Sequence, residues 1–197
     1  LAPVNIEIEA KVRVADIAPV EARLEDLDAE LAGRMTELNI FFDTDQRELK
    51  RSDRGLRIRE AIHDDGRSTV TITHKGPRMH GRLKKRREDE LDVDSVERAV
   101  GMLDALGYHE IIRFEKRRRR YRLDGCVIEL DEVPYLGCFV EIEGPDDQTI
   151  LNVRAGLGLD REPLISSSYV AMLQTHLVEN RIETREIGFK SAAAPSA

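Results

Sequence analysis

The chain of 197 residues is predicted to adopt an α+β fold, an eight-stranded antiparallel β-barrel with a charged interior and helices packed outside. Several strand-like segments alternate charged and aliphatic residues, and amphipathic helical segments lie between them. Because successive strand side chains point to opposite faces, each of these strands has one ionic and one apolar face. Amphipathic helices need an apolar surface to cover, at roughly 25 cal/mol per Å² of buried area. The aliphatic face is therefore expected to point outward and the charged face inward.

The first predicted strand, residues 4–14, has this alternation in its plainest form. Glu7, Glu9 and Lys11 fall on one side of it. The other side is aliphatic (Ile6, Ile8, Ala10 and Val12). The same charged row returns in four later segments, 56–59, 84–90, 127–131 and 139–143. Five such rows indicate one shared polar surface, lined by both acids and bases.

A helix is predicted after the first strand, ending near Gly33. Pro19 suits its first turn and a glycine suits its end. Its apolar positions share one face (Val20, Leu24, Leu27 and Leu31). Residues 38–43 and 55–61 then read as a hairpin-like pair of strands.

A tight turn at 64–66 leads into a strand over 69–75, which has strong β-branched alternation. A further extended segment follows over 82–93. Ser95 is placed to cap a short helix that ends at Gly107.

The second half of the chain continues with a hairpin and one more strand. The hairpin joins 114–123 to 126–133 through Asp124-Gly125, and the last strand covers 138–143. Two helical patterns follow at 150–157 and 167–181. One domain is predicted over 1–183, followed by a disordered tail over 184–197 that is small and polar toward its end.

The composition restricts the class of protein. Charged residues make up 35% of the chain against roughly 25% in ordinary domains, yet the hydrophobic fraction of 41% still allows a core. A net charge of -7 argues against nucleic acid or anionic membranes as partners. The sequence has no apolar run long enough for a membrane span and no secretory leader, which predicts a soluble, cytoplasmic protein. The two cysteines are expected to be reduced.

The two kinds of charge expected inside the barrel favour different ligands. Clustered carboxylates favour a hard divalent cation such as Mg²⁺ or Mn²⁺, whereas clustered Arg and Lys favour a polyanion. By strand parity the inward carboxylates are Glu7, Glu9, Glu88, Glu90, Glu129, Asp131, Glu141 and Glu143. The inward cations are Lys11, Arg57, Arg59, Lys75, Lys84, Arg86, Lys116 and Arg118. Together they predict a site for a metal-bound polyphosphate.

The segments that carry these charges also resemble, in order, the motifs of the CYTH superfamily, also called triphosphate tunnel metalloenzymes. Glu7-Ile-Glu9-Ala-Lys11 is similar to its E-x-E-x-K signature. The later matches are Leu56-Arg57-Ile58-Arg59, Thr73-His74-Lys75-Gly76-Pro77, Arg86-Arg87-Glu88-Asp89-Glu90, Lys116-Arg117-Arg118-Arg119-Arg120-Tyr121, 129–133, 137–143 and Ser168-Tyr169-Val170. The resemblance covers about residues 5 to 178.

The resemblance implies a metal-dependent tunnel that acts on linear triphosphates. Members include inorganic tripolyphosphatases, thiamine triphosphatases and class IV adenylyl cyclases, and family members are often dimers. The metal ligands it implies are Glu7, Glu9, Asp131, Glu141 and Glu143. The substrate-binding residues it implies are Arg57, Arg59, Lys75, Lys84, Arg86, Lys116 and Arg118. Lys11, Glu88 and Glu90 are the remaining catalytic candidates.

The leading functional hypothesis is hydrolysis of inorganic tripolyphosphate or of a small organic triphosphate. Conversion of ATP to cyclic AMP and diphosphate is the alternative, and a non-catalytic polyphosphate- or nucleotide-binding module is a third. The cyclases tend to carry an H/Q-x-D-x-Y-F motif before the second strand, and this chain has Leu38-Asn39-Ile40-Phe41-Phe42-Asp43 there. That departure favours hydrolysis. His74 lies opposite Lys75 by strand parity and is predicted to have a structural or surface role.

Overall fold

The computed structural model describes residues 5–192, and its strands form a single sheet. The strands are β1 (Ile6–Val14), β2 (Glu30–Asp43), β3 (Gly55–His63), β4 (Ser68–Lys75), β5 (Lys84–Val93), β6 (His109–Leu123), β7 (Cys126–Val133), β8 (Gly137–Glu143) and β9 (Glu186–Ile187). The helices are α1 (Ala18–Asp26), α2 (Glu48–Arg51), α3 (Val96–Ala105), α4 (Asp147–Gly156), α5 (Tyr169–Glu179) and α6 (Phe189–Ala192).

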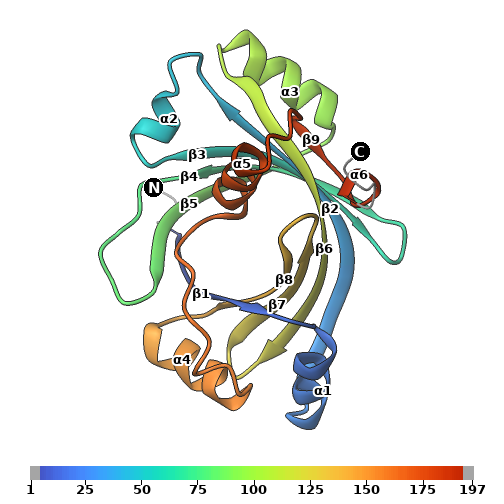
Figure 1. The fold of residues 1–197 in the computed structure, drawn as a ribbon, viewed down its shortest axis with the longest axis vertical. Coiled ribbons are helices and arrows are strands. Elements are labelled where there is room, and N and C mark those ends of the chain that lie inside the picture. Colours follow the sequence, from blue (N-terminus) through green and yellow to red (C-terminus); the bar gives the residue numbers. More distant parts are fainter. Residues whose placement is uncertain (1–4, 193–197) are drawn as a thin grey trace.

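The first eight strands close into an antiparallel barrel. Their order is β2-β3-β4-β5-β1-β8-β7-β6, and an additional pairing of β2 with β6 joins the two ends. Figure 1 shows these strands curving round a common centre, with α3 outside at the top and α1 and α4 outside at the bottom. The predicted eight-stranded barrel is confirmed.

The charged faces of the strands point inward, as the helices require. On β1, Ala10 and Val12 are buried in an outer apolar cluster with Leu24 of α1 and Ile150 of α4. A second outer cluster joins β2 and β3 to α3, through residues such as Ile58 and Leu103. Because the side-chain period of a strand is two, burying these aliphatic residues beneath helices turns Glu9 and Lys11 into the barrel.

Helix α5 departs from the expectation that all helices cover the outer face. Leu173 of α5 packs in a third cluster with Phe114 and Phe139, which share strand faces with the inward Lys116 and Glu141. The inward face of β6 and β8 is therefore apolar at one end of the barrel. The helix covers this end, where an aromatic lining would otherwise be left in water.

The first helix is shorter than predicted. It ends at Asp26, and Leu31 and Gly33, which were expected to close it, belong to β2. Asp28 takes a left-handed conformation (φ 55°), which turns the chain out of the helix. Gly33 (φ 152°) lies where the register of β2 against β6 shifts, a position that favours glycine. Helical periodicity does not reveal this β-bulge.

The predicted disordered tail is wrong for residues 184–192. Strand β9 pairs in parallel with β6, with Ile187 opposite Phe114, and α6 follows it. Ile187 is only 1% exposed and packs in the cluster beneath α5. Residues 193–197 lie outside the described part of the chain. A single buried isoleucine among polar neighbours gave too weak a pattern to predict this strand.

Replacing Ile187 with alanine is expected to destabilise the protein by about 2–5 kcal/mol, because the change removes buried methyl groups and leaves a cavity. The free energy of unfolding, from urea denaturation, measures the effect. Ile62→Ala is the matched control, since Ile62 is 52% exposed and loses little burial. Equal stability of the two variants would contradict the docking of β9.

Candidate functional site

The inward side chains surround a cavity of about 360 Å³ inside the barrel. Its charged lining includes residues from all three predicted groups. These are Glu7, Glu9, Lys11, Arg57, Arg59, Lys75, Lys84, Arg86, Lys116, Arg118, Glu141 and Glu143. The other three predicted site residues are not part of the lining, but each contacts one of its cations: Glu88 contacts Lys75, Glu90 contacts Arg59 and Asp131 contacts Arg118.

Three carboxylates meet at one point of the lining. Glu7 and Glu9 are two residues apart on β1 and therefore share its inward face, and Glu143 is the register partner of Glu9 on β8. One ligand oxygen from each of the three lies within 4.8 Å of the others. Such a set of hard oxygen donors suits Mg²⁺ or Mn²⁺.

The electrostatics of this carboxylate cluster also fit a cation. Burial and the nearby charges of Glu129 and Glu7 raise the pKa of Glu143 well above its usual value. Burial acts in the same direction on Glu7, but a hydrogen bond with Glu88 and the charges of Lys75 and Lys84 lower its pKa overall. Negative charge at Glu143 is therefore poorly compensated by the protein, and a bound divalent cation would relieve it.

Asp131 and Glu141, the other two predicted metal ligands, lie in a separate ion-pair network around Arg118. Arg118 donates to Asp131 (2.6 and 2.7 Å) and to Glu141 (2.7 Å), and it also pairs with Glu129. The structure therefore brings together three of the five predicted ligands.

Other side chains take up the remaining oxygens of this network. Lys116 (3.2 Å) and the Tyr169 hydroxyl (2.9 Å) donate to Asp131. Lys11 pairs with Glu141 at 3.0 Å. Asp131 and Glu141 are thus largely occupied by protein cations and a hydroxyl.

Glu37 is the central residue that sequence reasoning missed. It is 0% exposed and lies 3.2 Å from Lys116, 3.7 Å from Arg59 and 3.9 Å from Arg118. Burial opposes its charge, but these cations lower its pKa overall. The signal was present in Glu37-Leu38-Asn39, where two polar residues alternate with an aliphatic one. It was overlooked because β2 was expected to begin at Leu38.

Tyr169 is the second functional candidate whose position the sequence did not predict. It stands at the start of α5, yet its hydroxyl reaches Asp131 in the barrel interior. The ammonium of Lys11 lies 4.1 Å from the centre of its ring, and that of Lys116 lies 5.4 Å away. Tyr169 therefore joins α5 to two cations of the site through cation–π contacts.

Five predicted substrate cations come from the adjacent strands β3, β4 and β5. Lys84 pairs with Glu9 at 2.8 Å, and Lys75 pairs with Glu88 and lies 3.5 Å from Glu7. Arg57 donates to the Thr73 hydroxyl (3.3 Å). The other two are Arg59 and Arg86.

Arg57 shows the effect of burial and of like charge on this row of cations. Its buried Nε has no hydrogen-bond partner among residues 5–192. Its pKa is lowered by burial and by the neighbouring charge of Arg59. An anion among these cations would satisfy the free donor and offset their repulsion.

The three catalytic candidates have distinct surroundings. Lys11 forms an ion pair with Glu141 and donates a hydrogen bond to the Ser167 carbonyl oxygen at 3.1 Å. Burial and a hydrogen bond with Glu7 raise the pKa of Glu88 to about 7. Glu90 accepts from the Thr73 hydroxyl at 2.9 Å. His74, predicted to have a structural or surface role, lies on the opposite face of β4 and is 3.7 Å from Asp89.

Comparison with known proteins agrees with this architecture. The family model of the CYTH domain matches residues 5–161. The MJ0240 protein of Methanocaldococcus jannaschii, named provisionally as an adenylate cyclase, is 27% identical over 85% of this chain and 98% of its own length. Adenylate cyclase CyaB of Aeromonas hydrophila is 25% identical over 89% of this chain and 93% of its own.

Two solved structures have the same fold. The PH1819 protein of Pyrococcus horikoshii superposes with a TM-score of 0.76 at 26% identity, over 86% of this chain and 99% of its own. A Hippeastrum protein, HpAC1, has a TM-score of 0.67 at 19% identity, over 86% and 96% of the two chains. None of the helices in residues 5–192 is long and apolar enough to span a membrane. With its closed barrel, inward charges and family match over most of its length, the chain belongs to the CYTH domain family.

Proposed function

We propose that this chain is a metal-dependent phosphohydrolase that cleaves inorganic tripolyphosphate or a small organic triphosphate inside the barrel. The observation that carries the proposal is that a cluster of three carboxylates and a row of cations share one cavity. The carboxylates can hold a divalent cation and the cations can hold phosphate oxygens. A phosphate chain with its counter-ion requires both.

Glu7, Glu9 and Glu143 are the residues proposed to hold Mg²⁺ or Mn²⁺. A cation bound there would screen the negative charge of the triphosphate and orient it. Lys84 lies beside Glu9, which places a protein cation next to that position. The proposed ligand set leaves out Asp131 and Glu141, which do not belong to the group of three oxygens and pair directly with Arg118, Lys116 and Lys11.

The Arg and Lys side chains that line the cavity are proposed to stabilise the negative charge of the reacting groups. In hydrolysis a water attacks the terminal phosphorus, and the bond from this phosphorus to the bridging oxygen breaks to leave diphosphate. Arg57, Arg59 and Lys75 face the cavity from neighbouring strands and would stabilise charge on the phosphoryl and leaving groups. Arg118 and Lys116 are held by buried carboxylates, so they would need little reorganisation.

Adenylyl cyclisation is the second candidate, because two relatives of nearly the same length carry adenylate cyclase names. In that reaction the ribose 3'-hydroxyl would attack the α-phosphorus and release diphosphate. The names of relatives do not decide between the reactions in this fold. HpAC1 of Hippeastrum is named as a candidate adenylyl cyclase and described as having a dominant triphosphatase activity.

A substrate panel tests the proposal. Purified protein is incubated with tripolyphosphate, ATP or thiamine triphosphate, each with Mg²⁺, Mn²⁺ or excess chelator, and phosphate and cyclic AMP are measured together. We expect metal-dependent phosphate release that the chelator abolishes. Cyclic AMP without phosphate release would favour the cyclase. Ligand-induced thermal stabilisation without any product would identify a binding module and contradict both reactions.

A further inference from the structure

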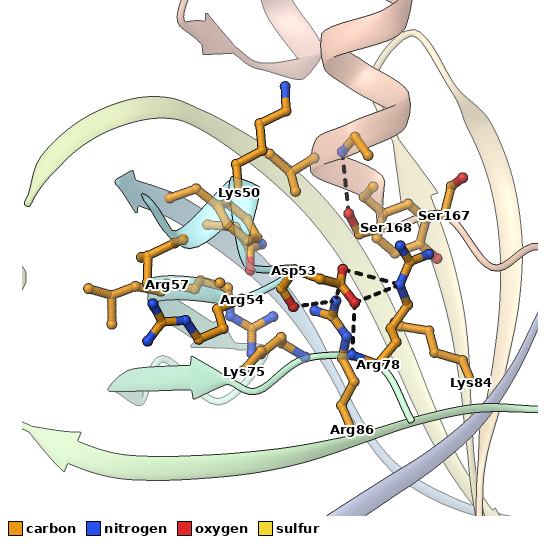
Figure 2. Close-up of a pocket in the computed structure, with 18 of the residues that line it drawn as sticks. Lys50, Asp53, Arg54, Arg57, Lys75, Arg78, Lys84, Arg86, Ser167 and Ser168 are labelled. Atoms are coloured by element: carbon orange, nitrogen blue, oxygen red, sulfur yellow. Dashed lines mark hydrogen bonds and ion pairs between the residues drawn. The ribbon is translucent and has the colours of Figure 1, made fainter. Parts of the chain in front are cut away.

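The mouth of the cavity carries a dense group of cations around one carboxylate. Figure 2 shows Asp53, in the turn between α2 and β3, among side chains from several segments. The cations labelled there are Lys50, Arg54, Arg57, Lys75, Arg78, Lys84 and Arg86, and all of them line the cavity.

Asp53 connects two loops and a strand through its backbone and side chain. Its carboxylate accepts from the Arg78 backbone N–H (2.8 Å) and from Arg78 Nε (3.0 and 3.1 Å). Arg86 Nη2 donates to its Oδ1 (2.7 Å) and to its carbonyl oxygen (3.1 Å). Two guanidinium groups, which lie 25 and 33 positions further along the chain, are thus held by one residue.

The backbone of Asp53 contributes to this arrangement. Asp53 has a left-handed conformation (φ 52°), which asparagine and aspartate tolerate better than most residues. Burial alone would raise the pKa of its carboxyl, but the hydrogen bonds from Arg78 and the charge of Arg86 lower it overall. The carboxylate is therefore anionic at neutral pH and permanently able to hold both arginines.

Arg86 keeps hydrogen-bonding capacity while Asp53 holds it. Its Nη2 donates to Asp53, and its buried Nε has no hydrogen-bond partner in the described part of the chain. A guanidinium is a planar fork, so holding one nitrogen fixes the direction of the others. Arg78 is half exposed, and without Asp53 its side chain would have many more accessible rotamers.

We propose that Asp53 is a positioning residue that holds Arg78 and Arg86 at the cavity mouth for binding a phosphate group of the substrate, and that Arg78 is a further substrate-binding residue. The inference rests on the proposed function, since it concerns the same triphosphate. Asp53 would act through the arginines and would not itself contact the reacting atoms. Its negative charge opposes anion binding, but the preorganised pair of guanidinium groups outweighs that repulsion.

The test compares Asp53→Asn with the wild type and with Asp45→Asn. Asparagine keeps the shape and the left-handed backbone preference and removes only the charge. Asp45 precedes the same helix, and its side chain is 80% exposed, which makes it a matched control. With tripolyphosphate, we expect Asp53→Asn to raise KM by about tenfold with a smaller change in kcat. The control is expected to match the wild type.

A double-mutant cycle shows whether Asp53 acts through the arginines. In the Arg78→Gln/Arg86→Gln background, we expect Asp53→Asn to produce no further rise in KM. An additive effect there, an unchanged KM, or a lowered KM in the single variant would overturn the inference. These outcomes are distinct from failure of the proposed function, in which wild-type protein neither hydrolyses tripolyphosphate nor binds it in titration calorimetry.

Discussion

Replacing Glu143 with glutamine is expected to lower metal-dependent phosphate release by about 100-fold or more and to leave the fold intact or more stable. Glutamine has the same shape but removes one of the three anionic donors of the carboxylate cluster. The stability expectation follows from the raised pKa of Glu143, which burial and the charges of Glu129 and Glu7 cause. Removing a poorly compensated charge relieves repulsion, so activity and stability should move in opposite directions.

Three measurements on Glu143→Gln separate these effects. Phosphate release from tripolyphosphate at several Mg²⁺ and Mn²⁺ concentrations reports activity, and calorimetric titration with Mn²⁺ alone reports metal affinity. Thermal denaturation without metal reports stability. Glu25→Gln is the control, because Glu25 is exposed on α1 outside the barrel. Wild-type Mn²⁺ affinity and activity in the Glu143 variant would contradict the assignment of the metal position.

Replacing Arg118 with methionine is expected to destabilise the protein by about 3–5 kcal/mol, or to prevent folding. Arg118 is 4% exposed and is the common partner of Asp131, Glu129 and Glu141. Methionine fills part of the volume of the Arg118 side chain but leaves these carboxylates buried with less positive charge beside them. The cost is therefore mainly that of uncompensated negative charge, not of lost packing.

Urea denaturation of Arg118→Met and of Arg122→Met provides the comparison. The Arg122 side chain is 62% exposed, and within residues 5–192 its ion pair is with Glu30 at 3.3 Å, so its replacement should cost less than about 1 kcal/mol. If Arg118→Met does not fold at pH 8, it should recover in part near pH 5, because protonation neutralises the buried carboxylates. A variant as stable as the wild type at pH 8 would contradict the central role of Arg118.

The five predicted metal ligands divide into three proposed ligands and two ion-pair partners, and this division has a physical basis. All five acids occupy inward positions, and strand parity cannot rank them. Glu143 faces Glu9 across the β1–β8 pair, which places like charges together. Asp131 faces Arg118 across the β6–β7 pair and accepts a hydrogen bond from the Tyr169 hydroxyl. Cross-strand neighbours thus set Glu143 beside another carboxylate and give Asp131 a guanidinium partner.

The residues missed from sequence show where local patterns fail. Glu37 was missed because the predicted strand began at Leu38, after a helix whose spacing was followed into the first residues of β2. Ile187 and Asp53 belong to segments without any periodic pattern. Their roles depend on Phe114, Arg78 and Arg86, to which they are brought only by folding.

Alternation along the strands was enough to predict which faces enter the barrel. Alternation is a local property with a period of two, and the helices' need for an apolar surface decides which face turns outward. Which of the inward groups meet depends on the folded chain, because strand register and closure set the neighbours of each charge. Glu9 and Glu143 are 134 positions apart and Arg86 and Asp53 are 33 apart, so no local pattern encodes their contacts. The interaction energies that distinguish a metal ligand from an ion-pair partner depend on those distances.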